Sequence, residues 1–266
     1  MTVLITGAGG GLGRAMAVEC AARGYDVFLT DIDEEQLGQI ASGLRRRFNV
    51  AVFARACDLT EAAEVSALFA DIEGRGIRLG MLLGIAGVDF EGGFMDRDCE
   101  RILDIVRLNI AATLRVTHAA LSRRDKAKKF DVMIVSSLAS LYPIPLKATY
   151  AASKRFLLDF SIALREEMKG QNVNVMALCP GGLPTTREAM DGIAAQGVWG
   201  GLTTNGLETV ASKAVDRMMA GRAKYTPGFV NIILGALGKL VPPEMIAKML
   251  HARWNDAQAQ WLQIEA

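Results

Sequence analysis

A serine, a tyrosine and a lysine within one stretch of the chain could together transfer a proton. Tyr150 lies thirteen residues after Ser137, and Lys154 follows the tyrosine by four residues. If this segment is helical, the tyrosine and the lysine lie on one face, one turn apart. An ammonium group beside a phenol favours the phenolate, so we expect the pKa of Tyr150 to fall from its reference value of about 10. The pattern predicts a general acid or base for an alcohol or carbonyl, with Ser137 hydrogen-bonded to the same oxygen.

A glycine-rich loop near the start of the chain could bind the redox partner of such a site. The apolar run Thr2 to Thr6 predicts a buried parallel strand, and Arg14 to Arg23 has the apolar spacing of a helix. Between them, glycines occupy positions 7, 9, 10, 11 and 13. They would let the backbone approach a pyrophosphate at the helix N-terminus. An ordinary flexible turn can look the same, so the interpretation depends on the strand before the loop and the helix after it.

The second predicted strand, Tyr25 to Thr30, is followed by Asp31. A carboxylate at this point can hydrogen-bond the adenosine ribose and would repel the 2′-phosphate of NADP. The acids at positions 33 to 35 add negative charge, and Arg14 is the only nearby cation in the sequence. The pattern therefore favours NAD over NADP. Asp31 or Asp33 could also cap the next helix, and the two roles are compatible.

Strands and helices alternate along the rest of the chain. We expect strands over residues 50–56, 81–85, 131–137, 173–179 and 224–226, and helices over residues 34–48, 61–75, 97–121, 150–169 and 208–220. This order predicts an α/β fold with a doubly wound parallel sheet, in a single domain over residues 1–266. The polar and small residues that follow the strands should then gather at one sheet edge, where such folds bind ligands.

Two of these positions allow more than one interpretation. Asp58 could hydrogen-bond the adenine amino group or cap the helix that starts near Thr60. Asn109 lies in the middle of the helix expected over residues 97–121, and asparagine is a mediocre helix former. It could be a satisfied buried amide, or it could mark a kinked helix whose carbonyl holds a water for proton relay.

With these motifs in order, residues 1 to about 190 resemble the short-chain dehydrogenase/reductase family. The matching motifs are TGxxxGxG at Thr6-Gly7, Gly11 and Gly13, the adenine-contacting aspartate at Asp58, the catalytic tetrad at Asn109, Ser137, Tyr150 and Lys154, and the PG motif at Pro180-Gly181 with Thr185. The chain departs from the family at Gly84-Ile85-Ala86-Gly87, where relatives usually have Asn-Asn-Ala-Gly, and at Met176, where many have Asn.

The resemblance implies a role for each member of the tetrad. Tyr150 is the acid/base, Ser137 orients the substrate oxygen, and Asn109 anchors the relay water. Lys154 lowers the tyrosine pKa and binds the nicotinamide ribose. The residues expected to contact the cofactor are Gly7, Gly11, Leu12, Gly13, Asp31, Asp58, Leu59, Ala86, Gly87, Tyr150, Lys154, Pro180, Gly181, Leu183 and Thr185. The resemblance also implies a homodimer or homotetramer that pairs through the helices over 97–121 and 150–169.

The last third of the chain is expected to select the substrate. Residues 186–207 combine apolar side chains with glycines and should form a closing substrate loop. The apolar lining, which could also be core, suggests a small lipophilic secondary alcohol or ketone. A hydroxysteroid, including a bile acid, is the leading candidate, and a 3-oxoacyl thioester or small polyol is less favoured. Residues 227–266 form an apolar helical tail that could cover the pocket, pack on a partner subunit or touch a membrane, in that order.

Composition excludes several other classes of function. The chain is 51% hydrophobic and 22% charged, which is typical of a globular protein, and its net charge of +1 gives no electrostatic case for nucleic acid. The four cysteines have no paired spacing, so we expect buried thiols in a reducing, cytoplasmic compartment and no metal site. We see no signal peptide, and no apolar run reaches the roughly 18 residues of a spanning helix.

Two further functions remain as alternatives to an NAD-dependent dehydrogenase. One is a non-enzymatic dinucleotide sensor on the same fold, since fold does not guarantee activity. Such a protein has no need of the intact Ser137, Tyr150 and Lys154 set, which favours the enzyme. The other is an acyl reductase that uses NADPH, against which Asp31 is the main argument.

Overall fold

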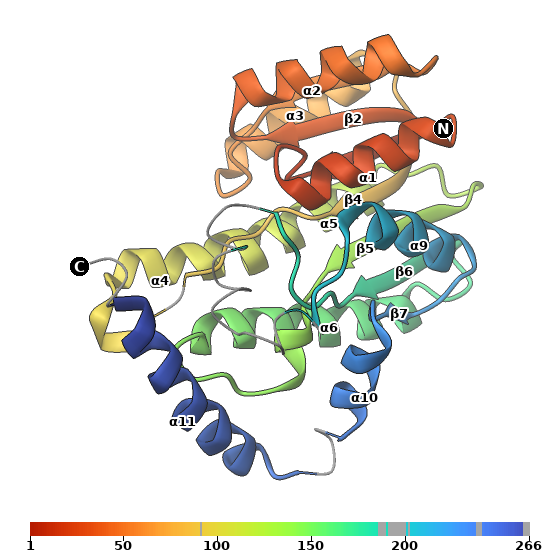
Figure 1. Ribbon diagram of the computed structural model, residues 1–266. Helices are drawn as coiled ribbons and strands as arrows, with labels where there is room; N and C mark the ends of the chain where they lie inside the picture. Colours follow the sequence, from red (N-terminus) through yellow and green to blue (C-terminus); the bar gives the residue numbers. More distant parts are fainter. Residues whose placement is uncertain (91, 186–189, 191–200, 202, 238–240, 263–266) are drawn as a thin grey trace.

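The computed structural model describes residues 1–90, 92–185, 190, 201, 203–237 and 241–262 (Figure 1). Seven parallel strands form one sheet in the order β3-β2-β1-β4-β5-β6-β7. Their bounds are β1 Thr2–Thr6, β2 Asp26–Asp31, β3 Val52–Ala56, β4 Leu79–Gly84, β5 Phe130–Val135, β6 Val173–Leu178 and β7 Lys224–Tyr225. The doubly wound parallel sheet predicted from the alternation of strands and helices is confirmed.

Helices cover both faces of this sheet, which is why its strands are almost continuously apolar. The helices are α1 Gly11–Ala22, α2 Glu34–Arg47, α3 Ala62–Gly74, α4 Cys99–Ile105, α5 Thr113–Ser122, α6 Ala148–Glu167, α9 Leu207–Met219, α10 Phe229–Leu237 and α11 Pro243–Leu262. The described residues also contain the 3₁₀ turns η1 Phe94–Asp96 and η3 Leu138–Leu141 and the π-helix η2 Val106–Ala112. In β1, Val3 and Ile5 pack with α1, α2 and α9, whereas Leu4 packs with α3, α5 and α6.

The helix expected over residues 97–121 is divided into three segments. It begins with α4, continues as the π-helix η2 and ends as α5. A π-helix makes wider turns than an α-helix and often marks a functional site. Asn109 lies inside η2, so the helix is distorted at the residue whose type disfavours a regular helix. The long helical element is confirmed as a continuous run over residues 99–122, and its distortion lies at Asn109.

Three of the four cysteines are buried as expected, namely Cys20, Cys57 and Cys179. Cys99 is exposed, which corrects the expectation of four buried thiols. It is the first residue of α4, directly after the N-cap Asp98, and the start of this helix faces solvent.

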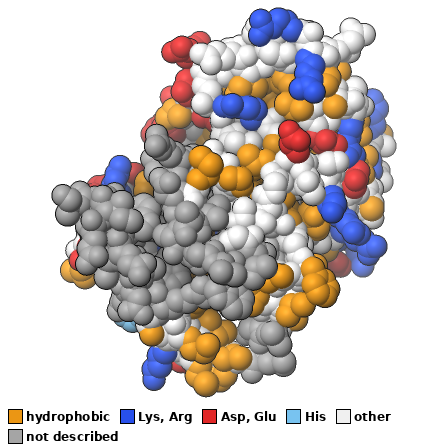
Figure 2. Space-filling model, viewed as in Figure 1, with side chains coloured by type: hydrophobic (Ala, Val, Ile, Leu, Met, Phe, Trp, Pro, Cys, Tyr) orange, Lys and Arg blue, Asp and Glu red, His pale blue; other side chains and the backbone are white. Residues whose placement is uncertain are grey.

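The described part of the C-terminal tail consists mainly of the helices α10 and α11. Phe229, Ile232 and Ile233 are exposed on α10, and Met245 and Met249 are exposed on α11. Figure 2 shows hydrophobic side chains in the lower part of the view, where Figure 1 places α10 and α11. None of the helices in the described ranges is long and apolar enough to cross a lipid bilayer.

Candidate active site

The loop between β1 and α1 lies closely against two other loops. Gly7 has a φ of +65°, and a Cβ there would lie 2.8 Å from the backbone of Ala86. A Cβ on Gly13 would collide with the carbonyl of Gly7, and one on Gly11 would lie 2.9 Å from the Cα of Thr185. A side chain at any of these three glycines would push these segments apart. The loop is therefore a compact cradle that joins the ends of β1 and β4 and the segment after β6.

Thr6 supports the segment in which the family's asparagines are replaced. Its hydroxyl accepts hydrogen bonds from the backbone N–H of Ile85 at 3.1 Å and of Ala86 at 3.3 Å. These bonds fix the chain where it leaves β4 towards Gly87. The segment from Gly84 to Gly87 is therefore held in place without the asparagine side chains that relatives usually have there.

The carboxylate of Asp31 faces the glycine loop. It accepts hydrogen bonds from the backbone N–H of Gly9 and of Ile32, each at 2.8 Å. The cap of α2 is Asp33, which accepts from the N–H of Gln36 at 2.9 Å. The two roles proposed for these acids are thus divided between them, and Asp31 remains next to the expected ribose position.

Asp58 stabilises the turn before α3. Its carboxylate accepts from the N–H of Thr60 at 2.8 Å and from the hydroxyl of the same residue at 2.7 Å. The N-cap of α3 is Glu61, whose side chain makes no capping bond. The alternative that Asp58 caps this helix is therefore wrong, because the helix begins at Ala62. Leu59 is buried beside this turn.

Tyr150 and Lys154 lie one turn apart in α6, as their spacing predicted. The Lys154 Nζ is 5.6 Å from the centroid of the Tyr150 ring and donates to the carbonyl of Val135 at 3.0 Å. Only 4% of Lys154 is exposed. Burial lowers the pKa of Lys154 from 10.5 to about 8, against the opposing charge of Asp89. The Lys154 ammonium is thus positioned next to the phenol by its place in α6 and by its hydrogen bond to β5.

Ser137 lies two residues beyond the end of β5 and is the N-cap of η3. Its Oγ accepts from the N–H of Ala139 at 3.1 Å, which leaves the hydroxyl proton for a substrate oxygen. The next residue, Leu138, donates its N–H to the carbonyl of Pro180 at 2.7 Å. The serine loop and the PG segment are therefore connected.

Asn109 is fully buried, and its amide is satisfied. The Oδ1 accepts from the N–H of Val88 at 2.8 Å, and the Nδ2 donates to the Val88 carbonyl at 3.0 Å and to the Ser153 Oγ at 3.1 Å. A Cβ on Gly87 would lie 2.9 Å from the Asn109 Oδ1 and 3.1 Å from the Lys154 Nζ. Gly87 therefore lies between two members of the tetrad. The relay water remains a prediction.

Three supporting residues were missed by the sequence analysis. Ser136 donates its hydroxyl to the Lys154 carbonyl at 2.7 Å, and Ser153 donates to the Tyr150 carbonyl at 2.8 Å. Asn231 is buried in α10 and donates to the carbonyls of Thr203 at 3.0 Å and Pro227 at 2.8 Å. A Cβ on Gly181 would lie 2.7 Å from the Asn231 Nδ2. Only the closeness of both serines to tetrad members could have indicated them in the sequence.

The remaining predicted residues are only partly described. Pro180, Gly181, Leu183 and Thr185 follow β6 at the carboxyl edge of the sheet. Most of the predicted substrate loop, namely residues 186–189, 191–200 and 202, lies outside the described residues. The expectation of a closing loop therefore stays a prediction.

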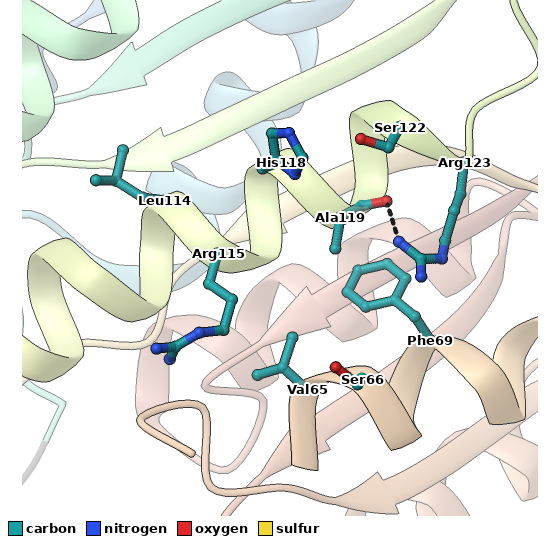
Figure 3. Close-up of a pocket in the computed structure, with 9 residues that line it drawn as sticks. All are labelled: Val65, Ser66, Phe69, Leu114, Arg115, His118, Ala119, Ser122 and Arg123. Atoms are coloured by element: carbon teal, nitrogen blue, oxygen red, sulfur yellow. Dashed lines mark hydrogen bonds between the residues drawn. The ribbon is translucent and has the colours of Figure 1, made fainter. Parts of the chain in front are cut away.

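A separate hollow of about 540 Å³ lies between α3 and α5. It is lined by Val65, Ser66, Phe69, Leu114, Arg115, His118, Ala119, Ser122 and Arg123. Figure 3 shows the Arg123 guanidinium over the Phe69 ring, at 5.4 Å from its centroid, and hydrogen-bonded to the Ala119 carbonyl. No member of the tetrad lines this hollow, so we keep it apart from the candidate active site.

Known proteins are similar to this chain in sequence and in fold. A family model described as short chain dehydrogenase matches residues 1–192. A very-long-chain 3-oxoacyl-CoA reductase of Laccaria bicolor is 31% identical over 174 residues, which cover 65% of this chain and 52% of that protein. The chain spans about half the length of the curated relatives it matches.

Two solved structures extend the likeness to most of the chain. A short-chain dehydrogenase from Sphingobium yanoikuyae in complex with NADPH has a TM-score of 0.77 and 27% identity, covering 90% of this chain and 94% of that one. A 7β-hydroxysteroid dehydrogenase has a TM-score of 0.82 and 22% identity, covering 94% and 96%, and shows a shared fold.

Proposed function

The chain belongs to the short-chain dehydrogenase family, and we propose that it transfers a hydride between NAD and a lipophilic secondary alcohol or ketone. The observation that carries this proposal is the Lys154 ammonium, fixed 5.6 Å from the Tyr150 ring. A cation at that distance stabilises the phenolate, and a phenolate can take the proton of a bound alcohol.

The described residues fit a dinucleotide. The cradle at Gly7, Gly11 and Gly13 has no room for side chains, which suits close approach of a pyrophosphate to the backbone. Asp31 would hold the adenosine ribose, and Lys154 the nicotinamide ribose. When bound, the nicotinamide ring supplies or accepts the hydride.

The tetrad would then manage the proton and the substrate oxygen. In the oxidative direction Tyr150 accepts the hydroxyl proton of the alcohol, and Ser137 donates its own proton to the same oxygen to fix its position. In the reductive direction Tyr150 returns the proton to the carbonyl oxygen. Asn109 keeps the segment at Val88 next to the reacting groups.

Asp31 supports NAD as the preferred cofactor. Its carboxylate is already ordered by the N–H groups of Gly9 and Ile32, so its charge cannot easily move away from an incoming 2′-phosphate. Arg14 donates to the Gly9 carbonyl at 3.4 Å, on the α1 side of the loop.

A second candidate function is reduction of a 3-oxoacyl thioester with NADPH. The Laccaria bicolor relative carries that activity in its name, and the Sphingobium yanoikuyae structure contains NADPH. For a hydroxysteroid, our first candidate substrate, the support is the apolar surroundings of the serine loop. A Cβ on Gly235 would lie 2.8 Å from the Leu141 side chain, so α10 packs against η3 next to Ser137.

We also propose that the protein acts as a homodimer or homotetramer. Leu103 on α4, Val106 on η2, and Phe156 and Ile162 on α6 are exposed apolar residues. These are the helices through which the family resemblance implies pairing. Burial of such side chains against a second copy would stabilise the assembly.

One experiment separates these candidates. Reduced nicotinamide absorbance is followed with NAD and with NADP across hydroxysteroids, long-chain 3-hydroxyacyl thioesters and small polyols. Turnover with NAD and a hydroxysteroid supports the first candidate, whereas turnover only with NADP and a thioester replaces it with the second. Tyr150→Phe should abolish turnover and preserve dinucleotide binding, while the remote Tyr25→Phe should change neither. Full activity of Tyr150→Phe would contradict the acid/base role.

A further inference from the structure

A second lysine lies as close to the catalytic tyrosine as the first. The Lys147 Nζ is 5.7 Å from the centroid of the Tyr150 ring, compared with 5.6 Å for Lys154. The family motif that identifies Tyr150 and Lys154 includes no residue at this position, so no motif singles out Lys147.

Lys147 is held by an acid from a different part of the chain. Its ammonium forms an ion pair with the Asp89 carboxylate at 2.6 Å. Asp89 is the neighbour of Val88 in the segment that follows β4. The lysine side chain is 13% exposed and the aspartate 30%. Solvent screens partly buried charges less than fully exposed ones. The charges of Lys147 and Asp89 can therefore influence neighbouring groups such as the Tyr150 phenol.

The backbone joins the same two segments. The N–H of Gly92 donates to the carbonyl of Leu146 at 2.9 Å. Leu146 has a φ of +64°, a left-handed conformation that is unfavourable for a residue with a side chain. The Lys147 carbonyl accepts a hydrogen bond from the N–H of Ala151 at 2.8 Å. This bond connects the segment at Leu146 and Lys147 to the first turn of α6.

The other charged groups on the elements around α6 have partners of their own. Arg155 pairs with Asp159 on the exposed side of α6, and Arg107 pairs with Glu100 and Asp104 on α4 and η2. The buried Cys179 thiol lies directly after β6, and Asp131 on β5 pairs with Lys129. Tyr142, at the end of η3, has a pKa raised by burial. The two cations that contact the Tyr150 ring among the described residues are thus Lys147 and Lys154, and Asp89 pairs with the first of them.

We propose that Lys147 is a positioning residue which, held by Asp89, sets the acidity of Tyr150 together with Lys154. Lys147 stabilises the phenolate, and Asp89 limits that effect by neutralising part of its charge. Because Asp89 lies in the segment after β4, the position of that segment would influence the proton affinity of the Tyr150 phenol. The inference rests on the proposed role of Tyr150 and adds a charge pair that tunes it.

The two partners predict opposite effects. Lys147→Met removes the cation and leaves Asp89, so the pKa of Tyr150 should rise by about one unit. Asp89→Asn leaves the cation without this counter-charge, so the same pKa should fall by about half a unit. Lys147→Arg keeps the charge and should stay close to the original protein.

The titration of Tyr150 can be measured without any substrate. The four tyrosines are labelled with ¹³C at Cζ, and the Tyr150 resonance is assigned by its loss in Tyr150→Phe. Lys129→Met is the matched control, because it breaks a similar ion pair, with Asp131 at 3.0 Å, away from Tyr150. It should leave the Tyr150 titration unchanged.

Opposite shifts in Lys147→Met and Asp89→Asn support the proposal. No shift in either variant, or shifts in the same direction, would overturn it and leave the pair as a structural clamp. If Lys147→Met does not fold, the direction of the Asp89→Asn shift decides. Because the readout needs no turnover, it stands even if the proposed substrate is wrong, and the activity of Tyr150→Phe tests that function separately.

Discussion

At the scale of single residues, Asp31 and Asp33 lie two positions apart and have different partners. Asp33 accepts from Gln36 and caps α2, whereas Asp31 binds the N–H of Gly9 in the cradle. The sequence pointed to Asp31 for the ribose but allowed either acid to cap the helix, because both precede it. Their separate contacts make it possible to test cofactor preference and helix stability independently.

Asp31→Ala should weaken the binding of NAD and remove the repulsion of the 2′-phosphate of NADP. We expect the NADP-to-NAD ratio of kcat/KM to rise by about tenfold or more, because a repulsive charge is removed. The measurement is steady-state kinetics with both cofactors. Asp33→Ala is the control and should lower the free energy of unfolding by about 1 kcal/mol with no change in the ratio. An unchanged ratio in Asp31→Ala would remove the argument for NAD.

Lys154 links activity to stability through its burial. Its folded pKa of about 8 is below the unfolded value of 10.5, so between these pH values the unfolded chain binds more protons. Through this group alone, stability therefore rises as the pH increases from about 8 to 10.5. Below about pH 8 the buried ammonium costs the fold up to about 3 kcal/mol.

Lys154→Met should be inactive, because the cation beside Tyr150 is lost. It should also be more stable than the original protein at pH 7, because no ammonium is buried. The difference in unfolding free energy should shrink as the pH rises through this window, and urea denaturation at a series of pH values measures it. Loss of the bond to the Val135 carbonyl offsets about 1 kcal/mol of the gain. Lys169→Met, at an exposed lysine, should show no such trend, and a pH-independent difference in Lys154→Met would contradict the argument.

At the scale of elements, the glycines of α1 and α2 illustrate what packing adds to propensity. Gly13 and Gly38 both lie within helices, where glycine is unfavourable by about 0.5–1 kcal/mol relative to alanine. A Cβ on Gly13 meets the Gly7 carbonyl, whereas a Cβ on Gly38 meets nothing within 4 Å. The same residue type is therefore required in one helix and dispensable in the next.

Gly38→Ala should stabilise the protein by about 0.5–1 kcal/mol and leave dinucleotide affinity unchanged. Gly13→Ala should destabilise it by about 1–3 kcal/mol, because the loop must move to relieve the overlap, and should also abolish dinucleotide binding. Thermal unfolding and calorimetry measure the two effects. Normal binding by Gly13→Ala would mean that the cradle adapts and is not the cofactor site.

At the scale of the whole molecule, the C-terminal helices are the part whose role is least fixed by the fold. α10 packs against η3 near the serine loop, and Asn231 ties it to Thr203 and Pro227. α11 keeps Met245 and Met249 exposed. This arrangement fits a tail that completes an apolar substrate pocket more than one that supports the core.

Truncation after Pro242 removes α11 and tests that assignment. We expect kcat/KM for a long apolar substrate to fall by about tenfold or more, with little change for a short ketone, because only the long substrate loses apolar contacts. The melting temperature should be almost unchanged. Equal loss for both substrates, or a change in molecular mass by light scattering, would instead assign α11 to assembly.

Local patterns along the chain predicted the order of elements, and the resemblance to a known family singled out Asn109, Ser137, Tyr150 and Lys154. Short, continuous apolar runs that end at a glycine, an acid or a proline are local features, so they predicted the seven strands and the parallel sheet. The spacing of Tyr150 and Lys154 is also local, because one helical turn separates them. Parallel topology then brought the ends of the strands to one edge, as expected.

Contacts between segments far apart in sequence became visible only in the folded chain. Thr6 supports Ile85, Asn109 holds Val88, and Lys147 pairs with Asp89, and each partner belongs to a different strand, loop or helix. A hydrogen bond or ion pair across such separations depends on packing, and no local pattern records it. For the same physical reason the sequence could name the residues of the tetrad and could not name the charge pair beside them.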